Sequence, residues 1–171
     1  MRKLKPGSPS VKAAMMNPEA RSVVIRGMEG GAVATAAMSA VMLAAQKAGF
    51  MGKLPPEKIT EAALDSLEVD REEPTENALT TLAHFAFGIG CGGLFGWLDA
   101  KTASADLSPV VKGVTFASFV WLVSYSGWVP ALGIMPRPKH DRRGRPTSML
   151  VAHWVFGGVL GSFLHAVGAR R

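Results

Sequence analysis

The feature that most constrains this chain is a set of long segments without a charged side chain. No Asp, Glu, Lys or Arg occurs at 77–98, 113–136 or 146–169, and a shorter segment, 30–46, has the same character. A helix needs about 20 predominantly apolar residues to cross the hydrocarbon core of a bilayer. The pattern therefore predicts four transmembrane helices. Their approximate bounds are 27–50, 78–98, 109–135 and 147–169.

The distribution of charge argues against the main competing class of basic proteins. Net charge is +6. A nucleic-acid-binding domain presents a basic face with side chains that read or stack on bases. Here the basic residues flank the apolar segments instead, so we do not expect nucleic acid as a partner. The single cysteine, Cys91, can form neither a disulfide within the chain nor a cysteine-based zinc site.

Polar segments complete the expected organisation. Residues 1–26 are expected to form a basic tail, partly disordered, ahead of a transmembrane domain at 27–169. The first loop, 51–76, holds eight acidic and three basic residues. Prolines at its start and apolar residues at helical spacing predict a short amphipathic helix on the membrane surface. Because the last loop, 137–145, holds five basic residues, we expect the two loops to attract each other.

The charge of the tail also predicts the orientation. Basic segments next to transmembrane helices stay on the cytoplasmic side, and the tail carries six basic residues. When the tail, the loops and the C-terminus are counted together, the basic residues divide almost evenly between the two sides of the membrane. The tail therefore decides the orientation. We therefore expect both termini in the cytoplasm, with the protein in a bacterial inner membrane.

A repeated string divides the chain into two halves. AHFAFG at 83–88 recurs as AHWVFG at 152–157. Upstream, a Gly-x-Met string precedes prolines in both halves, at 49–51 and 133–135. We therefore expect an all-α fold, an integral membrane four-helix bundle made of two helical hairpins. Because each hairpin crosses the membrane twice, the hairpins would be parallel repeats about a pseudo-two-fold axis along the membrane normal.

Small residues recur at every fourth position of the expected helices. Lipid tails are as apolar as leucine, so transmembrane helices associate through close contact at small side chains. We expect helix packing at the glycines that follow each repeated histidine, and at a similar alanine stripe in the first helix. The glycines are Gly88, Gly92, Gly96, Gly157 and Gly161, and the alanines are Ala32, Ala36, Ala40 and Ala44.

His84 and His153 occupy matching positions in the two repeats, so we expect them at similar depth in the membrane. Three roles are open: structural histidines hydrogen-bonded at a helix interface, the axial ligands of one haem b iron, or part of a proton path. Thr80, Ser124 and Tyr125 add polarity to the second and third helices. No nucleophile with an adjacent base, phosphate-binding loop or dinucleotide motif is found, so we expect no catalytic residue, and two histidines alone do not make a metal site.

Four segments carry a resemblance to a known family. They are GAVATAAMSAVMLAAQKAGFMGKLPPEKITEAAL, AHFAFGIGCGGLFGWL, FVWLVSYSGWVPALGIMP and AHWVFGGVLG. Over roughly residues 27 to 168 the chain resembles a family of small bacterial membrane proteins of unknown activity, broadly similar to the YagU-like inner-membrane proteins. The resemblance implies a membrane location and carries no catalytic residues with it.

These observations favour a non-enzymatic inner-membrane protein, a transport or assembly component. Two alternatives stay open. One is a redox protein that binds haem b through His84 and His153, and the other is a structural subunit of a larger membrane complex. The expected partners are the lipid bilayer and either a second copy of the chain or another membrane protein.

Overall fold

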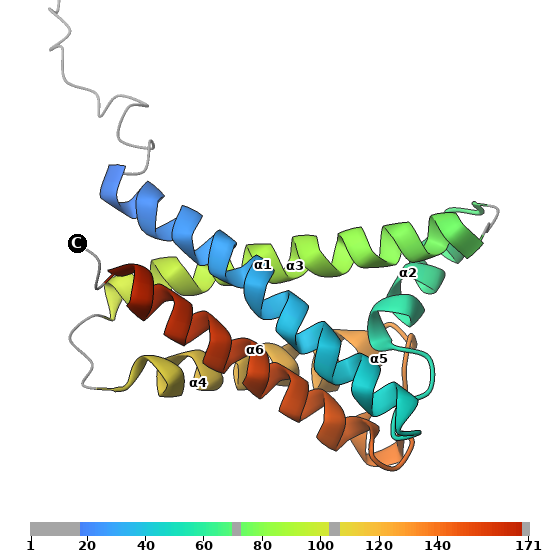
Figure 1. The fold of residues 1–171 in the computed structure, drawn as a ribbon. Coiled ribbons are helices and arrows are strands. Elements are labelled where there is room, and N and C mark those ends of the chain that lie inside the picture. The colour runs from blue at the N-terminus through green and yellow to red at the C-terminus, as the bar shows by residue number, and fades with distance from the viewer. Residues whose placement is uncertain (1–17, 70–72, 103–106, 169–171) are drawn as a thin grey trace, which may run out of the picture.

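A computed structural model describes residues 18–69, 73–102 and 107–168. All secondary structure in these ranges is helical, with no strand. The helices are α1 (Pro18–Lys47), α2 (Pro55–Ser66), α3 (Glu73–Lys101), α4 (Pro109–Val123), α5 (Val129–Ala131) and α6 (Arg145–Gly168), with a π-helix, η2 (Ser124–Trp128), and a 3₁₀ turn, η3 (Pro138–His140). The prediction of an all-α fold is confirmed (Figure 1).

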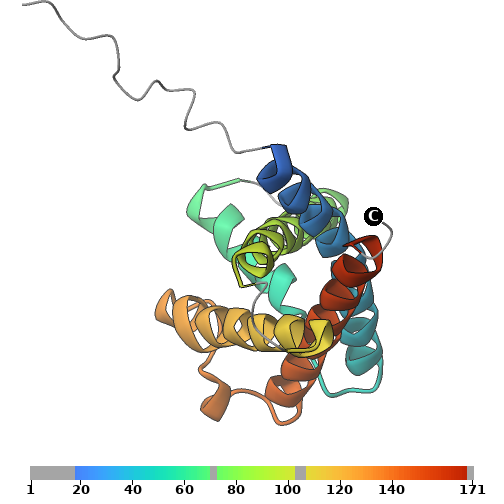
Figure 2. The same cartoon turned by 90° about the vertical axis from the view of Figure 1, so that its left-hand side faces the viewer.

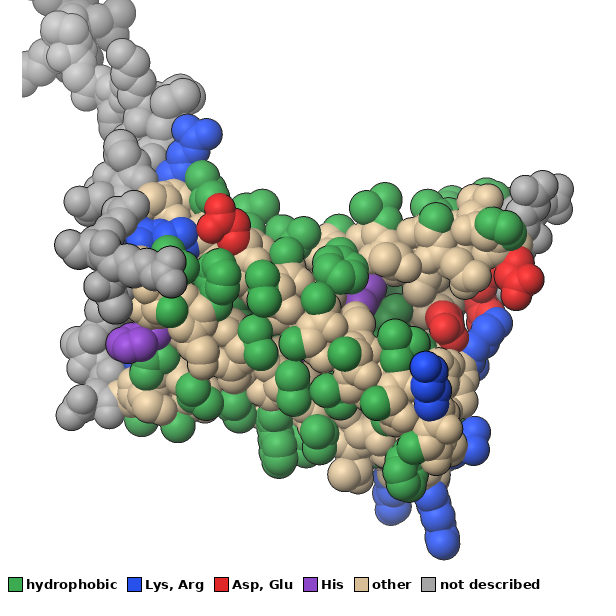
Figure 3. All heavy atoms as spheres, viewed as in Figure 1, with side chains coloured by type: hydrophobic (Ala, Val, Ile, Leu, Met, Phe, Trp, Pro, Cys, Tyr) green, Lys and Arg blue, Asp and Glu red, His purple; other side chains and the backbone are tan. Residues whose placement is uncertain are grey.

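Four of these helical stretches are long and apolar enough to cross a membrane. They are Arg21–Lys47, Glu73–Lys101, Pro109–Ala131 and Arg145–Gly168. On the face shown in Figure 3, charged side chains gather at the two ends of the molecule, and the surface between them is largely uncharged. This is the distribution that a bilayer requires of a spanning protein.

The ends of the helices differ from the expected bounds. α1 begins at Pro18, so the second part of the stretch assigned to a tail is helical, whereas residues 1–17 lie outside the described ranges. α1 then ends at Lys47, before the expected boundary at 50. The other helical stretches start at or before the expected positions, because uncharged segments mark the membrane core rather than the helix ends.

The four long helices form an array with one open side. α1 packs against α3 and α6, and α6 packs against α4, whereas α3 and α4 barely touch. Seen from the end, α3 and α4 flank the array, and α1 and α6 form its back (Figure 2). The side between α3 and α4 is called the seam here.

Glycines set how closely α3 approaches α1. A β-carbon added to Gly92 would lie 2.6 Å from the α-carbon of Gly31, and one added to Gly96 would lie 3.2 Å from the α-carbon of Gly27. Real β-carbons do not tolerate such contacts, so the two backbones touch directly at these positions. The expected alanine stripe of α1 does not take part in this contact, because Ala36, Ala40 and Ala44 are exposed. α1 uses glycine instead.

The same device joins α4 to α6. A β-carbon on Gly157 would lie 2.8 Å from Cβ of Ala117, and one on Gly161 would lie 2.8 Å from the carbonyl carbon of Pro109. Gly113 completes the contact from α4. Close approach at small residues replaces the hydrophobic driving force that holds helices together in water.

A π-helical turn interrupts the third long stretch. Val129 donates its N–H to the carbonyl of Ser124, five residues earlier. The next residue, Pro130, has no N–H, and its ring would clash with the carbonyl of Ser126 in a regular α-helix. A wider turn relieves that clash, which explains the π-helix at this position.

α2 follows a short loop and packs against α3. The Leu54 N–H donates to Oε2 of Glu57 at 2.8 Å and caps the start of the helix. Pro55, Thr60 and Leu64 are buried. A helix is therefore present where an amphipathic helix was expected, and it buries Thr60 as well as Leu64, whereas Leu67 is exposed. Its place on the membrane surface stays a prediction.

A hydrogen bond joins the two end loops. Nη2 of Arg142 donates to the carbonyl of Gly49 at 3.0 Å. Each loop also contains an ion pair of its own: Lys53 pairs with Glu61, and Arg145 pairs with Asp141 at 2.7 Å. The expected attraction between the acidic and the basic loop stays a prediction.

Candidate functional site

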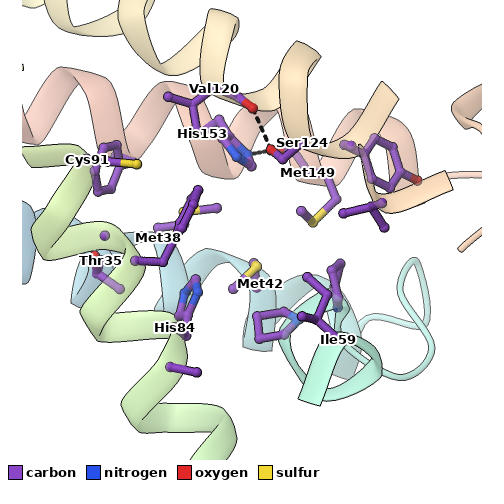
Figure 4. Close-up of a pocket in the computed structure, with 18 of the residues that line it drawn as sticks. Thr35, Met38, Met42, Ile59, His84, Cys91, Val120, Ser124, Met149 and His153 are labelled. Carbon is purple, nitrogen blue, oxygen red and sulfur yellow. Dashed lines mark hydrogen bonds between the residues drawn. The ribbon is translucent and has the colours of Figure 1, made fainter. Parts of the chain in front are cut away.

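A cavity of about 250 Å³ lies among the four long helices, with α2 at one end. Its lining comes from α1, α2, α3, α4 with η2 and α5, and α6, so segments from nearly the whole chain surround it (Figure 4). Most of the lining is apolar, and its polar side chains are few: Thr35, Thr60, Thr80, His84, Ser124, Tyr125 and His153. This space is called the central cavity here.

His84 and Thr80 bring two polar groups to the α3 wall. They lie four residues apart on one helix, so they share a face. Nε2 of His84 and Oγ1 of Thr80 are buried, and neither has a hydrogen-bond partner among the described residues. Buried polar atoms are paired in the great majority of cases. Two such atoms on one wall therefore mark a place that would gain from a polar partner.

His153 faces the cavity from α6 and is only 7% exposed. Its Nδ1 lies 2.7 Å from the carbonyl oxygen of Met149. Because a carbonyl only accepts, Nδ1 carries the hydrogen, and in the neutral ring Nε2 is left as an acceptor. The backbone of α6 thus sets the tautomer of this imidazole.

Methionines form much of the apolar wall. Met38 and Met42 of α1 and Met149 of α6 line the cavity, and all three are buried. In Figure 4 the side chain of Met38 lies between the imidazoles of His84 and His153. A methionine side chain has three rotatable bonds and adapts to irregular neighbours. This wall can therefore change shape without movement of a helix.

The cavity reaches the surface at the seam. Ala83 and Phe87 of α3 and Trp128 of η2 line it and are exposed, Phe87 to 52% and Trp128 to 37%. These residues belong to the two elements that flank the open side of the array. The mouth of the cavity consequently opens sideways, between helices, and not along their axes.

The arrangement offers little to a metal ion or a haem group. The described residues contain no group of three His, Cys, Asp or Glu side chains that could hold a metal. In the view of Figure 4, the side chain of Met38 lies where a haem between the two imidazoles would be placed. The cavity is also smaller than the range of about 300–1,000 Å³ typical of pockets for drug-sized ligands.

Sequence reasoning identified part of this site. It singled out His84 and His153, and both line one cavity. Of the five glycines, Gly88 lines the cavity, and all five lie at helix contacts. His165 is exposed on α6 and does not line it. It missed that Thr80 and His84 line the same wall of the cavity. Their spacing of four residues on one helix was a signal that could have predicted this.

Comparison with known proteins places the chain in a family. DUF6789, described as a family of unknown function, matches residues 21–171, so the chain belongs to it. No curated protein and no solved structure matches. The family match does not connect the chain with the YagU-like proteins, and that resemblance stays a prediction.

Proposed function

We propose that this member of DUF6789 is a non-enzymatic protein of the bacterial inner membrane, and that it binds a small lipid-soluble molecule in the central cavity as a transport or assembly component. The observation that carries the proposal is the position of the cavity mouth. Ala83, Phe87 and Trp128 frame it at the seam, and they belong to two helical stretches that are long and apolar enough to span a bilayer. A ligand dissolved in the membrane would reach this mouth without crossing water.

The orientation in this proposal has both termini in the cytoplasm. The six basic residues of the tail support this orientation, because moving such a tail across a membrane is unfavourable. The seam and the exposed apolar side chains of all four long helices would then face lipid. Trp97, Trp128 and Trp154 are each exposed, as expected for rings that contact the bilayer.

The proposal includes two repeated hairpins, α1 with α3 and α4 with α6. Gly31 meets Gly92 in the first pair, and Gly113 meets Gly161 in the second. The first helix of each hairpin is followed by a glycine with positive φ, Gly49 at 81° and Gly133 at 72°. The stretch from Gly113 to Gly133 is two residues longer than the stretch from Gly31 to Gly49. The π-helix η2 lies within the longer stretch. A single π-helical turn accommodates one extra residue in a helix, so η2 accounts for one of these two residues.

Substitution at the mouth tests the binding function. Ala83→Trp places a bulky ring on the exposed lining of the seam. Ala40→Trp is the matched control, because Ala40 is exposed on α1, two positions from both Met38 and Met42, and so points away from the cavity. The measurement is the rise in Tm of the detergent-purified protein with increasing naphthalene, a lipid-soluble probe, because a ligand that binds the folded state raises Tm.

We expect naphthalene to raise the Tm of the unsubstituted protein and of Ala40→Trp, and to have little effect on Ala83→Trp. Equal shifts in all three proteins would place the effect in the micelle and would contradict binding in the cavity. Purification of the protein in a stable assembly with another membrane protein, with no response to the probe, would favour the alternative of a structural subunit.

A further inference from the structure

The central cavity holds a feature that apolar binding does not use. Oγ1 of Thr80 and Nε2 of His84 are buried on one face of α3 without a partner among the described residues. Both residues line the cavity. An apolar ligand would leave both groups unpaired, whereas a ligand with a hydroxyl would pair them.

We infer that the cavity recognises a hydroxyl group carried by an aromatic ring, which makes its ligand a lipid-soluble phenol. This inference rests on the proposed function and names the chemical class of the ligand. With the hydrogen of His84 on Nδ1, Nε2 accepts a hydrogen bond from the phenol O–H. The Thr80 hydroxyl donates to the phenol oxygen, so the two groups on α3 satisfy one hydroxyl between them.

The apolar lining favours an aromatic body over an alkyl chain. Met38, Met42 and Met149 provide three thioethers, and Phe87 and Trp128 frame the mouth. A methionine sulfur makes favourable contacts with the edge of an aromatic ring. The two elements of the seam barely touch, which leaves a path by which a ring can enter.

Entry of the ring requires one local movement. The two polar atoms are covered in this structure, and Met38 lies between the two imidazoles (Figure 4). Met38 belongs to α1, whose backbone is held against α3 by glycine contacts. Its side chain can nevertheless change rotamer while the backbone stays in place. The ring would then occupy the space that the thioether leaves, with its hydroxyl toward α3.

The opposite wall supports the same orientation. His153 already donates its Nδ1 hydrogen to Met149 at 2.7 Å, and Ser124 donates to the carbonyl of Val120. The hydrogens of these two side chains are thus already donated in hydrogen bonds within their own helices. A ligand hydroxyl finds both a donor and an acceptor without a partner at the α3 wall, on Thr80 and His84.

The test compares two probes that differ by one hydroxyl, 2-naphthol and naphthalene. Affinities come from the concentration dependence of Tm in detergent, and the quantity of interest is their ratio. We expect the unsubstituted protein to prefer 2-naphthol by about 5- to 20-fold, as two added hydrogen bonds predict. Thr80→Val and His84→Phe keep the approximate shapes of the side chains, and we expect each to lower the preference by about 3- to 10-fold.

The neighbouring threonine provides the control. Thr81 is exposed, its Oγ1 donates to the carbonyl of Asn77 at 2.9 Å, and it does not line the central cavity. We expect Thr81→Val to keep the full preference for 2-naphthol. Tm without probe shows whether each variant is folded, and a variant that retains naphthalene binding has kept the cavity.

The outcomes separate the two proposals. If both probes bind equally and Thr80→Val changes nothing, the cavity binds apolar molecules and recognition of a hydroxyl is overturned. If neither probe binds and Ala83→Trp also has no effect, the proposed binding function itself fails. If the preference falls equally in Thr80→Val and Thr81→Val, the effect is not local to the cavity and the inference is wrong.

Discussion

The hydroxyl of Thr35 on α1 occupies the place that a β-carbon of residue 88 on α3 would take. Thr35 is 1% exposed, and its Oγ1 donates to the carbonyl of Gly31 at 2.7 Å. The contact lies at the edge of the central cavity, which both residues line. The crossing of α1 and α3 and the shape of the cavity therefore depend on the same glycine.

This contact predicts the effect of one added methyl group. Gly88→Ala forces the Thr35 side chain and the two backbones apart, and overpacking of this kind costs about 1–3 kcal/mol. Gly90→Ala is the control, because nothing lies within 4 Å of a β-carbon at that position on the same helix. We expect a change of no more than about 1 kcal/mol for Gly90→Ala. Unfolding of both variants in mixed micelles measures the difference, and equal stability would contradict the tight crossing.

Asp141 ties the last loop to the end of the bundle, and its charge should matter. It accepts from Oη of Tyr125 at 2.5 Å, from the N–H of Arg142 at 2.6 Å and from Nη1 of Arg145 at 2.7 Å. The side chains of Arg145 and Asp141 are 8% and 2% exposed. Asp141→Asn leaves a buried guanidinium without its counter-charge, so we expect a loss of at least about 2 kcal/mol of unfolding free energy.

Glu61→Gln is the comparison for that variant. It removes the ion pair with Lys53. The side chains of Lys53 and Glu61 are 54% and 17% exposed, so water reaches this pair more readily than it reaches Arg145 and Asp141. Exposed ion pairs contribute little, and the expected loss is less than about 1 kcal/mol. Chemical unfolding of the two variants in the same detergent ranks them, and a larger effect for Glu61→Gln would show that the Asp141 cluster does not hold the loop.

The haem alternative makes a prediction of its own. Because Met38 lies between the imidazoles of His84 and His153, we expect no haem in protein purified from haem-replete cells. The visible spectrum should lack a Soret band and a sharp α-band after reduction with dithionite. A Soret band that is lost in both His84→Ala and His153→Ala would instead identify a haem protein with those two ligands.

The orientation can be tested with thiol labelling. Ser66, the last residue of α2, and Thr102, the residue after α3, are exposed on the two connections that precede and follow α3. Cys91→Ala removes the single native thiol. With both termini in the cytoplasm, a membrane-impermeant reagent should label Ser66→Cys in intact spheroplasts. It should label Thr102→Cys only after the membrane is made permeable. The reverse pattern would place the termini outside.

The sequence predicted the parts of the structure that depend on local chemistry. The absence of charge over long segments indicated the four apolar helices, since each such segment must hide from water. Pro55 and the acidic residue that follows indicated α2. The packing glycines of α3 and α6 were visible because close helix contact needs small residues at every fourth position.

The parts that were missed depend on contacts between distant segments. α1 meets α3 at Gly27 and Gly31, and the more regular alanine stripe of α1 points elsewhere. Nothing in the spacing of small residues tells which stripe finds a partner. The central cavity was likewise invisible, because it arises where α3 and α4 fail to pack. An absent contact leaves no pattern in a single sequence.

The unequal lengths of the helices at the seam have a consequence for the surrounding lipid. At 1.5 Å per residue, the 29 residues of α3 rise about 44 Å, and the 23 residues from Pro109 to Ala131 rise about 35 Å. The hydrocarbon core of a bilayer is about 30 Å thick, so α3 must tilt or protrude more than its counterpart. Lipid chains beside the opening then meet two walls of different height. The bilayer deforms most beside the seam. A change in bilayer thickness would therefore change the force on the two helical stretches that frame the mouth of the cavity.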